Sequence, residues 1–221
     1  MIPGVQNQHH LDPKWANFPQ VAGVAIAVFL TAWAARRGRA ERSDTSRAGD
    51  RARLVVGAVA LFFATPYIAA ELGFFLDGVP VLGWIFQTGA IKPEPGGGYA
   101  HAAVHHGHHH GMDGFLLAVS ALLLSRLVGA MRHATLAAVT ALYLSWMLVY
   151  GFTNQVEDLW IEQVAKRGWT SWLIPNVIYP SPSVAAAWVA MLAVAVLFYR
   201  TMFRPGAAPS MRRLAGGGPG R

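Results

Sequence analysis

The sequence contains no cysteine and few charged residues. Only 13% of its 221 residues are Asp, Glu, Lys or Arg, about half the share in an ordinary soluble domain. The lack of cysteine excludes disulfide frameworks, thiolate zinc sites, cysteine-bound iron–sulfur clusters and thiol nucleophiles. Because 54% of the residues are hydrophobic, too few polar side chains remain to coat a soluble enzyme of this length.

Several motifs are also missing from the sequence. It has no phosphate-binding glycine-rich loop, nucleophile elbow, HExxH pair or dinucleotide fingerprint, which does not favour an enzyme. Every histidine lies outside or at the end of a hydrophobic run, so a b-type haem held by two histidines between helices is not expected. The runs contain few ionisable groups, which argues against a complete, self-sufficient transporter.

Long apolar runs, by contrast, are abundant. A helix needs roughly 20 mostly apolar residues to cross a bilayer core about 30 Å thick. Five segments come close to this length, and we predict an all-α bundle of five transmembrane helices in the inner (plasma) membrane. Residues 1–204 would form this single domain, and residues 205–221 a disordered tail. The predicted spans are residues 18–35, 54–75, 111–131, 134–152 and 184–203.

The distribution of arginine predicts the orientation. Fourteen of the 18 basic residues fall in the loop 36–53, around the turn between the third and fourth spans, or in the C-terminal tail. The positive-inside rule then puts the N-terminus outside and the C-terminus in the cytoplasm. The basic excess is therefore interpreted as a topology signal and a contact with lipid headgroups, not as a nucleic-acid surface. No cleavable signal peptide is expected.

Two longer segments fall on the predicted outer face. Residues 76–110 form an outer histidine-rich loop, and its apolar start is too short to cross the membrane. Residues 153–182 combine tryptophans with acids and a basic pair. We predict an amphipathic helix over about residues 156–167, lying on the outer surface, followed by a connector anchored by aromatic side chains.

The outer loop carries the strongest chemical signal in the chain. Six of its histidines fall within ten residues, and neutral imidazole is a common ligand of zinc, copper and nickel. Such tracts bind these metals almost regardless of purpose, so a tract without a cellular role stays open as an alternative. The neighbouring glycines 96–98 indicate a mobile segment that other groups would have to organise. The six candidate ligands are His101, His105, His106, His108, His109 and His110.

Four carboxylates could complete a metal site on the same face. Asp113 begins the third span, Glu71 lies in the outer part of the second, and Glu157 and Asp158 lie where the fourth emerges. An acid within a span is costly and usually faces a partner or a cavity. The alternative is that Glu71 is hydrated near the headgroups or hydrogen-bonds a neighbouring Tyr or Thr.

Three functions remain open on this sequence. The first is handling of a divalent or copper ion by the outer loop, in capture, transport or an accessory role. The second is a metal-dependent membrane oxidoreductase or hydroxylase, or one of its subunits. The third is a structural accessory subunit of a membrane complex. The expected partners are the lipid bilayer, the metal ion and a second copy or a larger complex, with no nucleic acid.

Overall fold

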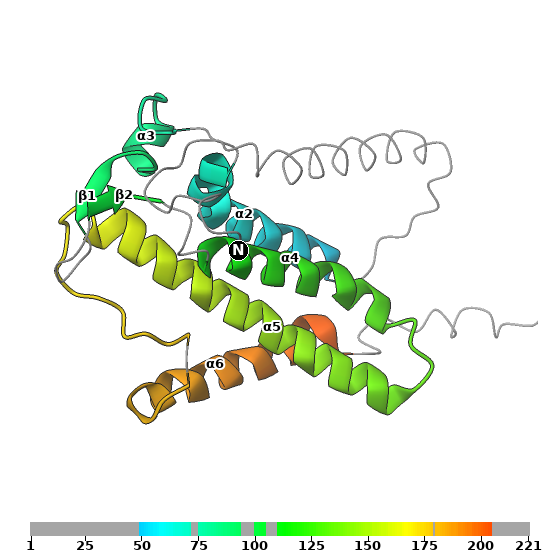
Figure 1. Ribbon diagram of the computed structural model, residues 1–221. Coiled ribbons are helices and arrows are strands. Elements are labelled where there is room, and N and C mark those ends of the chain that lie inside the picture. Colours follow the sequence, from blue (N-terminus) through cyan, green and yellow to red (C-terminus); the bar gives the residue numbers. More distant parts are fainter. Residues whose placement is uncertain (1–48, 72–74, 94–99, 105–109, 179, 205–221) are drawn as a thin grey trace, which may run out of the picture.

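The computed structural model describes residues 49–71, 75–93, 100–104, 110–178 and 180–204. This part of the chain is mostly helical, and its long helices lie side by side in a bundle (Figure 1). The bundle helices are α2 (Asp50–Glu71), α4 (His110–Val128), α5 (Ala134–Trp160) and α6 (Ala185–Phe198). Shorter turns extend them, namely η3 (Ile161–Ala165) after α5, and η4 (Pro182–Val184) and η5 (Tyr199–Phe203) on either side of α6.

Four helical segments are long and apolar enough to cross a membrane. They correspond to the second, third, fourth and fifth predicted spans, so the described part of the chain has the helices of a polytopic membrane protein. The first predicted span, residues 18–35, and the predicted tail, residues 205–221, lie outside the described residues. The four segments are Asp50–Ala70, His110–Val128, Ala134–Ala165 and Pro182–Phe203.

Small residues allow the bundle helices to pack closely. Gly114 of α4 and Gly151 of α5 are both buried and face each other: a Cβ added at Gly151 would lie 2.6 Å from the Gly114 carbonyl oxygen. Ala60, Ala118 and Ala141 are fully buried in the same core. Between membrane helices such close contact is a main source of association, because lipid chains are as apolar as the side chains they would replace.

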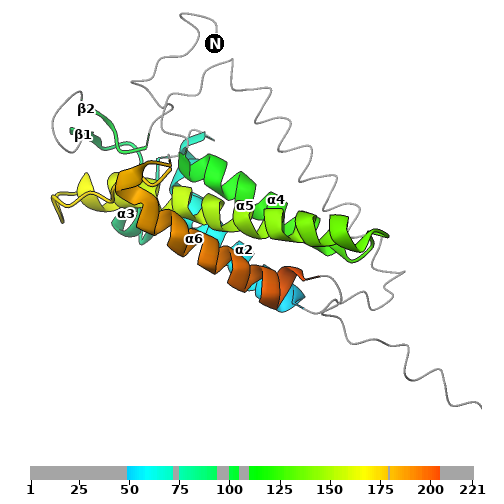
Figure 2. The same ribbon diagram turned by 90° about the horizontal axis from the view of Figure 1, so that it is seen from below.

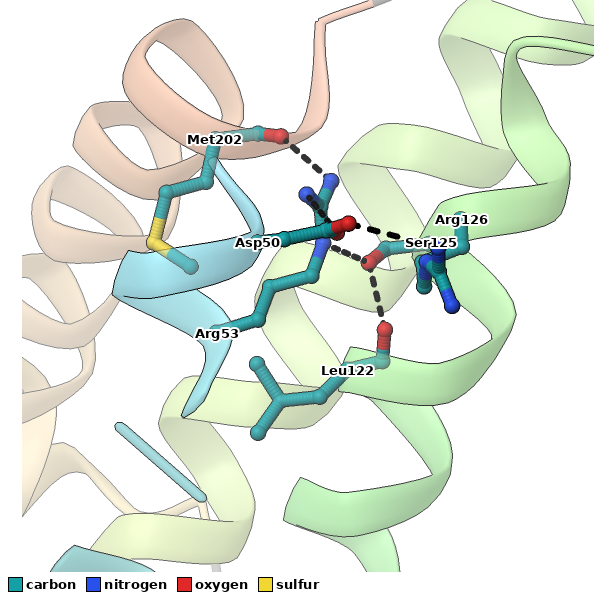
Figure 3. A network of polar contacts seen from close by, with 6 residues as sticks. All are labelled: Asp50, Arg53, Leu122, Ser125, Arg126 and Met202. Carbon is teal, nitrogen blue, oxygen red and sulfur yellow. Dashed lines mark hydrogen bonds and ion pairs between the residues drawn. The ribbon is translucent and has the colours of Figure 1, made fainter. Parts of the chain in front are cut away.

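A polar network ties three helices together at one end of the bundle (Figure 3). The Arg53 guanidinium of α2 donates to the Ser125 hydroxyl of α4 at 2.8 Å and to the Met202 carbonyl of η5 at 2.9 Å. Asp50 pairs with Arg53 at 3.4 Å and with Arg126 at 3.2 Å. These contacts satisfy charged groups where the helices end, and they gather arginines at this end.

The opposite end carries a cap, which we define as residues 75–93 and 100–104. It contains α3 (Leu82–Ile85) and an antiparallel ribbon of β1 (Ile91–Pro93) and β2 (Ala100–Ala102). Both views place these elements at one end of the bundle (Figures 1 and 2). Gln163 of η3 fixes the cap by accepting from the Gln87 N–H and donating to the Gln87 carbonyl, both at 2.7 Å.

The fourth predicted span differs from the structure in where it ends. We expected the membrane helix to stop at residue 152, with a separate surface helix over residues 156–167. Instead the helix continues from Ala134 through Ala165 without a break. Its polar residues are buried rather than solvated, because the cap and the neighbouring helices cover them; Gln155 and Glu162, for example, are 0% and 1% exposed.

Candidate functional site

The described residues on either side of positions 105–109 are held at the cap end of the bundle. On one side, Ala103 and Val104 are buried, and their N–H groups donate to the carbonyls of Ala90 and Thr88 at 2.9 and 3.2 Å. On the other side, the Gly111 N–H donates to the Asp158 carboxylate of α5 at 2.7 Å. The histidine-rich run is therefore bracketed by two anchor points on the same end of the molecule.

The Gly111–Asp158 contact closes the N-terminal end of α4 with a side chain from another helix, α5. The first N–H groups of a helix have no partner within it and carry partial positive charge. The Asp158 side chain, which is 3% exposed, accepts one of them and complements that charge. Residue 111 must be glycine here, because any Cβ would collide with the ring of Tyr67.

Asp158 belongs to a polar face that runs along the end of α5. Gln155, Asp158, Glu162 and Lys166 follow one another at intervals of three or four residues, which places them on one side of a helix. The Gln155 amide donates to the Ala60 carbonyl of α2 at 3.0 Å. Glu162 and Lys166 form an ion pair of 2.9 Å, with their side chains 1% and 0% exposed. Two acids and one base leave this face with an excess of one negative charge.

Tyr67 of α2 lies beside this face. Its side chain is 3% exposed, and its hydroxyl has no hydrogen-bond partner within the described part of the chain. Asp158 and Glu162 are within electrostatic range of it. A buried phenol without a partner loses its hydrogen bonds to water without replacement, so this hydroxyl is a costly buried group beside the two acids.

The predicted site residues divide into three groups. Asp158 accepts from the Gly111 N–H at the start of α4, the helix that begins at His110 and has Asp113 exposed in its first turn. Glu157 lies elsewhere, in a cleft among α2, α5 and α6. Across the described residues, no three His, Asp or Glu side chains are arranged to hold a metal. Glu71 ends α2 and His101 lies in β2, but their side chains, like all of His105, His106, His108 and His109, lie outside the description.

Tyr67, Glu162 and Lys166 were not among the candidates from the sequence. The spacing of Gln155, Asp158, Glu162 and Lys166 was available as a signal, since it continues the helical period of the apolar run before it. Tyr67 had no such signal. Its place beside the acids depends on how α2 packs against α4 and α5, which no local pattern specifies.

Asp77 fixes the cap segment that supports the histidine-rich run. Its carboxylate accepts from the Gly89 N–H at 2.7 Å, the Thr88 hydroxyl at 2.8 Å and the Thr88 N–H at 3.1 Å. Burial alone would raise the pKa of Asp77, but these hydrogen bonds favour the charged form and lower the pKa below its ordinary value. The same Thr88 supplies the carbonyl that anchors Val104.

We therefore expect an acid-dependent loss of stability that Asp77→Asn removes. A lowered folded-state pKa contributes stability above about pH 4, and the contribution is lost as the pH falls through that pKa. The variant should be about 1 kcal/mol less stable at pH 7, because the side chain is exposed and its charge is screened. The measurement is unfolding of the purified protein between pH 7 and pH 3, where the difference should shrink.

Asp113→Asn is the matched control for this measurement, since it replaces an exposed carboxylate of α4. It leaves the hydrogen bonds of Asp77 intact, so it should lose less stability at pH 7 than Asp77→Asn does. An equal gap between wild type and Asp77→Asn at pH 7 and at pH 3 would contradict the role of the Asp77 charge.

Comparison with known proteins gives no further guide to the site. No known protein family, curated protein or solved structure matches this chain. The function must therefore be argued from the helices, the cap and the residues around the start of α4.

Proposed function

We propose that the chain is a five-span inner-membrane protein that captures a divalent or copper ion with the histidines of residues 101–110. The N-terminus and the cap would face outside, and the C-terminus would face the cytoplasm. The metal ion is the cargo of the protein. Imidazoles would receive it, and the acids of the α5 face would hold it closer to the bundle.

One observation carries this proposal: both anchors of the histidine-rich run lie on the end of the bundle where Asp158 and Glu162 are buried. Ala103 bonds to the cap and receives a hydrogen bond from Lys166 at 3.5 Å, while Gly111 bonds to Asp158. A run of six histidines supplies three or four metal donors without long-range folding. The excess negative charge of the α5 face would attract a cation, and it offsets the partial positive charge at the start of α4.

The orientation is supported by the arginines of the described residues. Six of the seven described arginines fall at the end opposite the cap, where the network of Figure 3 lies, whereas Arg167 donates to the Trp84 and Ile85 carbonyls of the cap. The positive-inside rule favours a cytoplasmic position for this end and an outside position for the cap. A reporter inserted beside residue 100 should be active only outside the cytoplasm, and activity only in the cytosol would overturn the orientation. The arginines concerned are Arg51, Arg53, Arg126, Arg132, Arg200 and Arg204.

The test is metal binding by the full chain without an affinity tag, in lipid nanodiscs. We expect Zn²⁺, Cu²⁺ or Ni²⁺ to bind at a defined stoichiometry, measured by calorimetry and elemental analysis. Replacing the six histidines of the run by alanine should weaken binding at least about tenfold, equivalent to about 1.4 kcal/mol. Binding should also weaken below about pH 6.5, because protonated imidazole cannot bind metal.

The matched control replaces the three histidines outside the run, His9, His10 and His133. It should keep the affinity and stoichiometry of the wild type. If this control loses as much metal as the six-histidine variant, or if the latter loses none, capture by the run is refuted.

A further inference from the structure

A second site, separate from the histidine-rich run, lies on the side of the bundle. α2 and α6 both pack against α5, and a cleft of about 480 Å³ runs among the three helices. Its walls are almost entirely aliphatic or aromatic, with Val59 from α2, Phe152 from α5 and Val194 from α6 among them. The volume lies in the range of sites that bind small molecules. Val59 and Val194 are 42% exposed, so the cleft opens toward the bilayer.

One acid lines this apolar cleft. The Glu157 side chain comes from α5, and the residue is only 5% exposed. Its Oε2 atom is buried and has no hydrogen-bond partner among the described residues. Leaving a buried carboxyl oxygen unpaired is unfavourable, because the oxygen loses its hydrogen bonds to water and gains none in return. A leucine here would avoid that cost, so the acid indicates a ligand that supplies the missing donor.

The chemistry of the cleft restricts what the ligand can be. The apolar walls require a hydrocarbon body, and Oε2 requires a hydrogen-bond donor at its head. A hydroxyl meets this need at smaller desolvation cost than an ammonium ion, which would lose its hydration shell among aliphatic side chains. Beside Glu157, the Thr153 hydroxyl is already engaged: it donates to the Val149 carbonyl at 3.0 Å and contacts the Met191 sulfur at 3.2 Å. Because the Thr153 hydroxyl is engaged in this way, Glu157 is the acceptor for the head of the ligand.

We propose that this cleft binds a hydroxyl-headed, long-chain lipid that enters from the bilayer and donates a hydrogen bond to Glu157. The hydrocarbon chain lies between α2 and α6 along the valines and phenylalanines. The site does not depend on metal capture, because Glu157 faces this cleft whereas Asp158, the next residue, faces the start of α4. Successive residues on a helix point about 100° apart, which separates the two carboxylates.

The test uses three photoactivatable hexadecyl probes that differ only in the head: a primary alcohol, a primary amine and a methyl ether. The full chain in nanodiscs is labelled, and the labelled residues are located by mass spectrometry. The alcohol should label cleft residues such as Val194 or Phe152 at least about tenfold more than the ether. Glu157→Leu should remove this preference, since it removes the oxygen that accepts the hydrogen bond by which the alcohol differs from the ether.

Two further variants keep the test independent of folding. Ala190→Phe fills the cleft from α6 and should abolish labelling, whereas Leu197→Phe, on an exposed position of the same helix outside the cleft, should not. Glu157→Leu should unfold at the same temperature as the wild type or higher, because it removes an unpaired buried acid. Equal labelling by alcohol and ether, stronger labelling by the amine, or no labelling of the cleft by any probe would each overturn the proposal.

Discussion

Replacing Lys166 by methionine should destabilise the protein by about 3–5 kcal/mol. The Lys166 ammonium lies 2.9 Å from Glu162, and both side chains are almost completely buried. Methionine keeps the length of the side chain but removes the charge, so the buried Glu162 carboxylate would lose the ammonium that lies 2.9 Å from it. The measurement is unfolding of the full chain in detergent micelles, followed by tryptophan fluorescence.

The double variant Glu162→Gln with Lys166→Met separates lost pairing from lost packing. Removing both charges also removes the buried carboxylate that the ammonium had paired with, so the double variant should recover most of the stability that Lys166→Met loses. Lys92→Met, in the half-buried ribbon position of β1, is the matched control and should cost less than about 1 kcal/mol. A Lys166→Met variant as stable as Lys92→Met would contradict the assigned ion pair.

The sequence predicted the membrane helices well, because a hydrophobic run of membrane length carries its own signal. The four described spans begin and end within about a turn of the predicted bounds, except at the end of α5. There the acids and amides from Asn154 onward indicated solvent, since polar side chains are buried only with partners. The partners come from the cap, such as Gln87 for Gln163, and from α2, such as Ala60 for Gln155. Contacts so distant in sequence leave no local pattern.

Only part of the candidate site could be predicted from the sequence. Composition alone identified the histidine-rich run, and proximity in sequence grouped Glu157 with Asp158. Helical geometry divides that pair, sending Asp158 to Gly111 and Glu157 to the lateral cleft. The hydrogen bonds of Asp77 within the cap could not be predicted from the sequence either. They depend on a turn that brings residues 88 and 89 back to residue 77.

Substituting Gly151 by alanine should destabilise the protein by about 3 kcal/mol. This is the upper end of the usual cost of overpacking a core, because the atoms that the new Cβ would meet belong to the backbone of α4. The new Cβ would lie 2.6 Å from the Gly114 carbonyl oxygen and 3.0 Å from the Ala118 nitrogen. Neither atom can move without shifting α4 as a whole. Helix propensity works in the other direction, since alanine favours a helix over glycine by about 1 kcal/mol, so a net loss of stability must come from the contact.

Gly57→Ala is a control for which the opposite sign is expected. Gly57 is also within a bundle helix, but among the described residues its added Cβ would meet only the Leu122 side chain, at an ordinary contact distance of 3.7 Å. Propensity should then dominate, and the variant should unfold at a higher denaturant concentration or temperature than the wild type. If Gly151→Ala unfolds at the same midpoint as the wild type or at a higher one, as Gly57→Ala should, α4 and α5 do not approach as closely as Gly114 and Gly151 require. The buried position of Asp158 at the start of α4 would then need another explanation, because the same helix pair positions it.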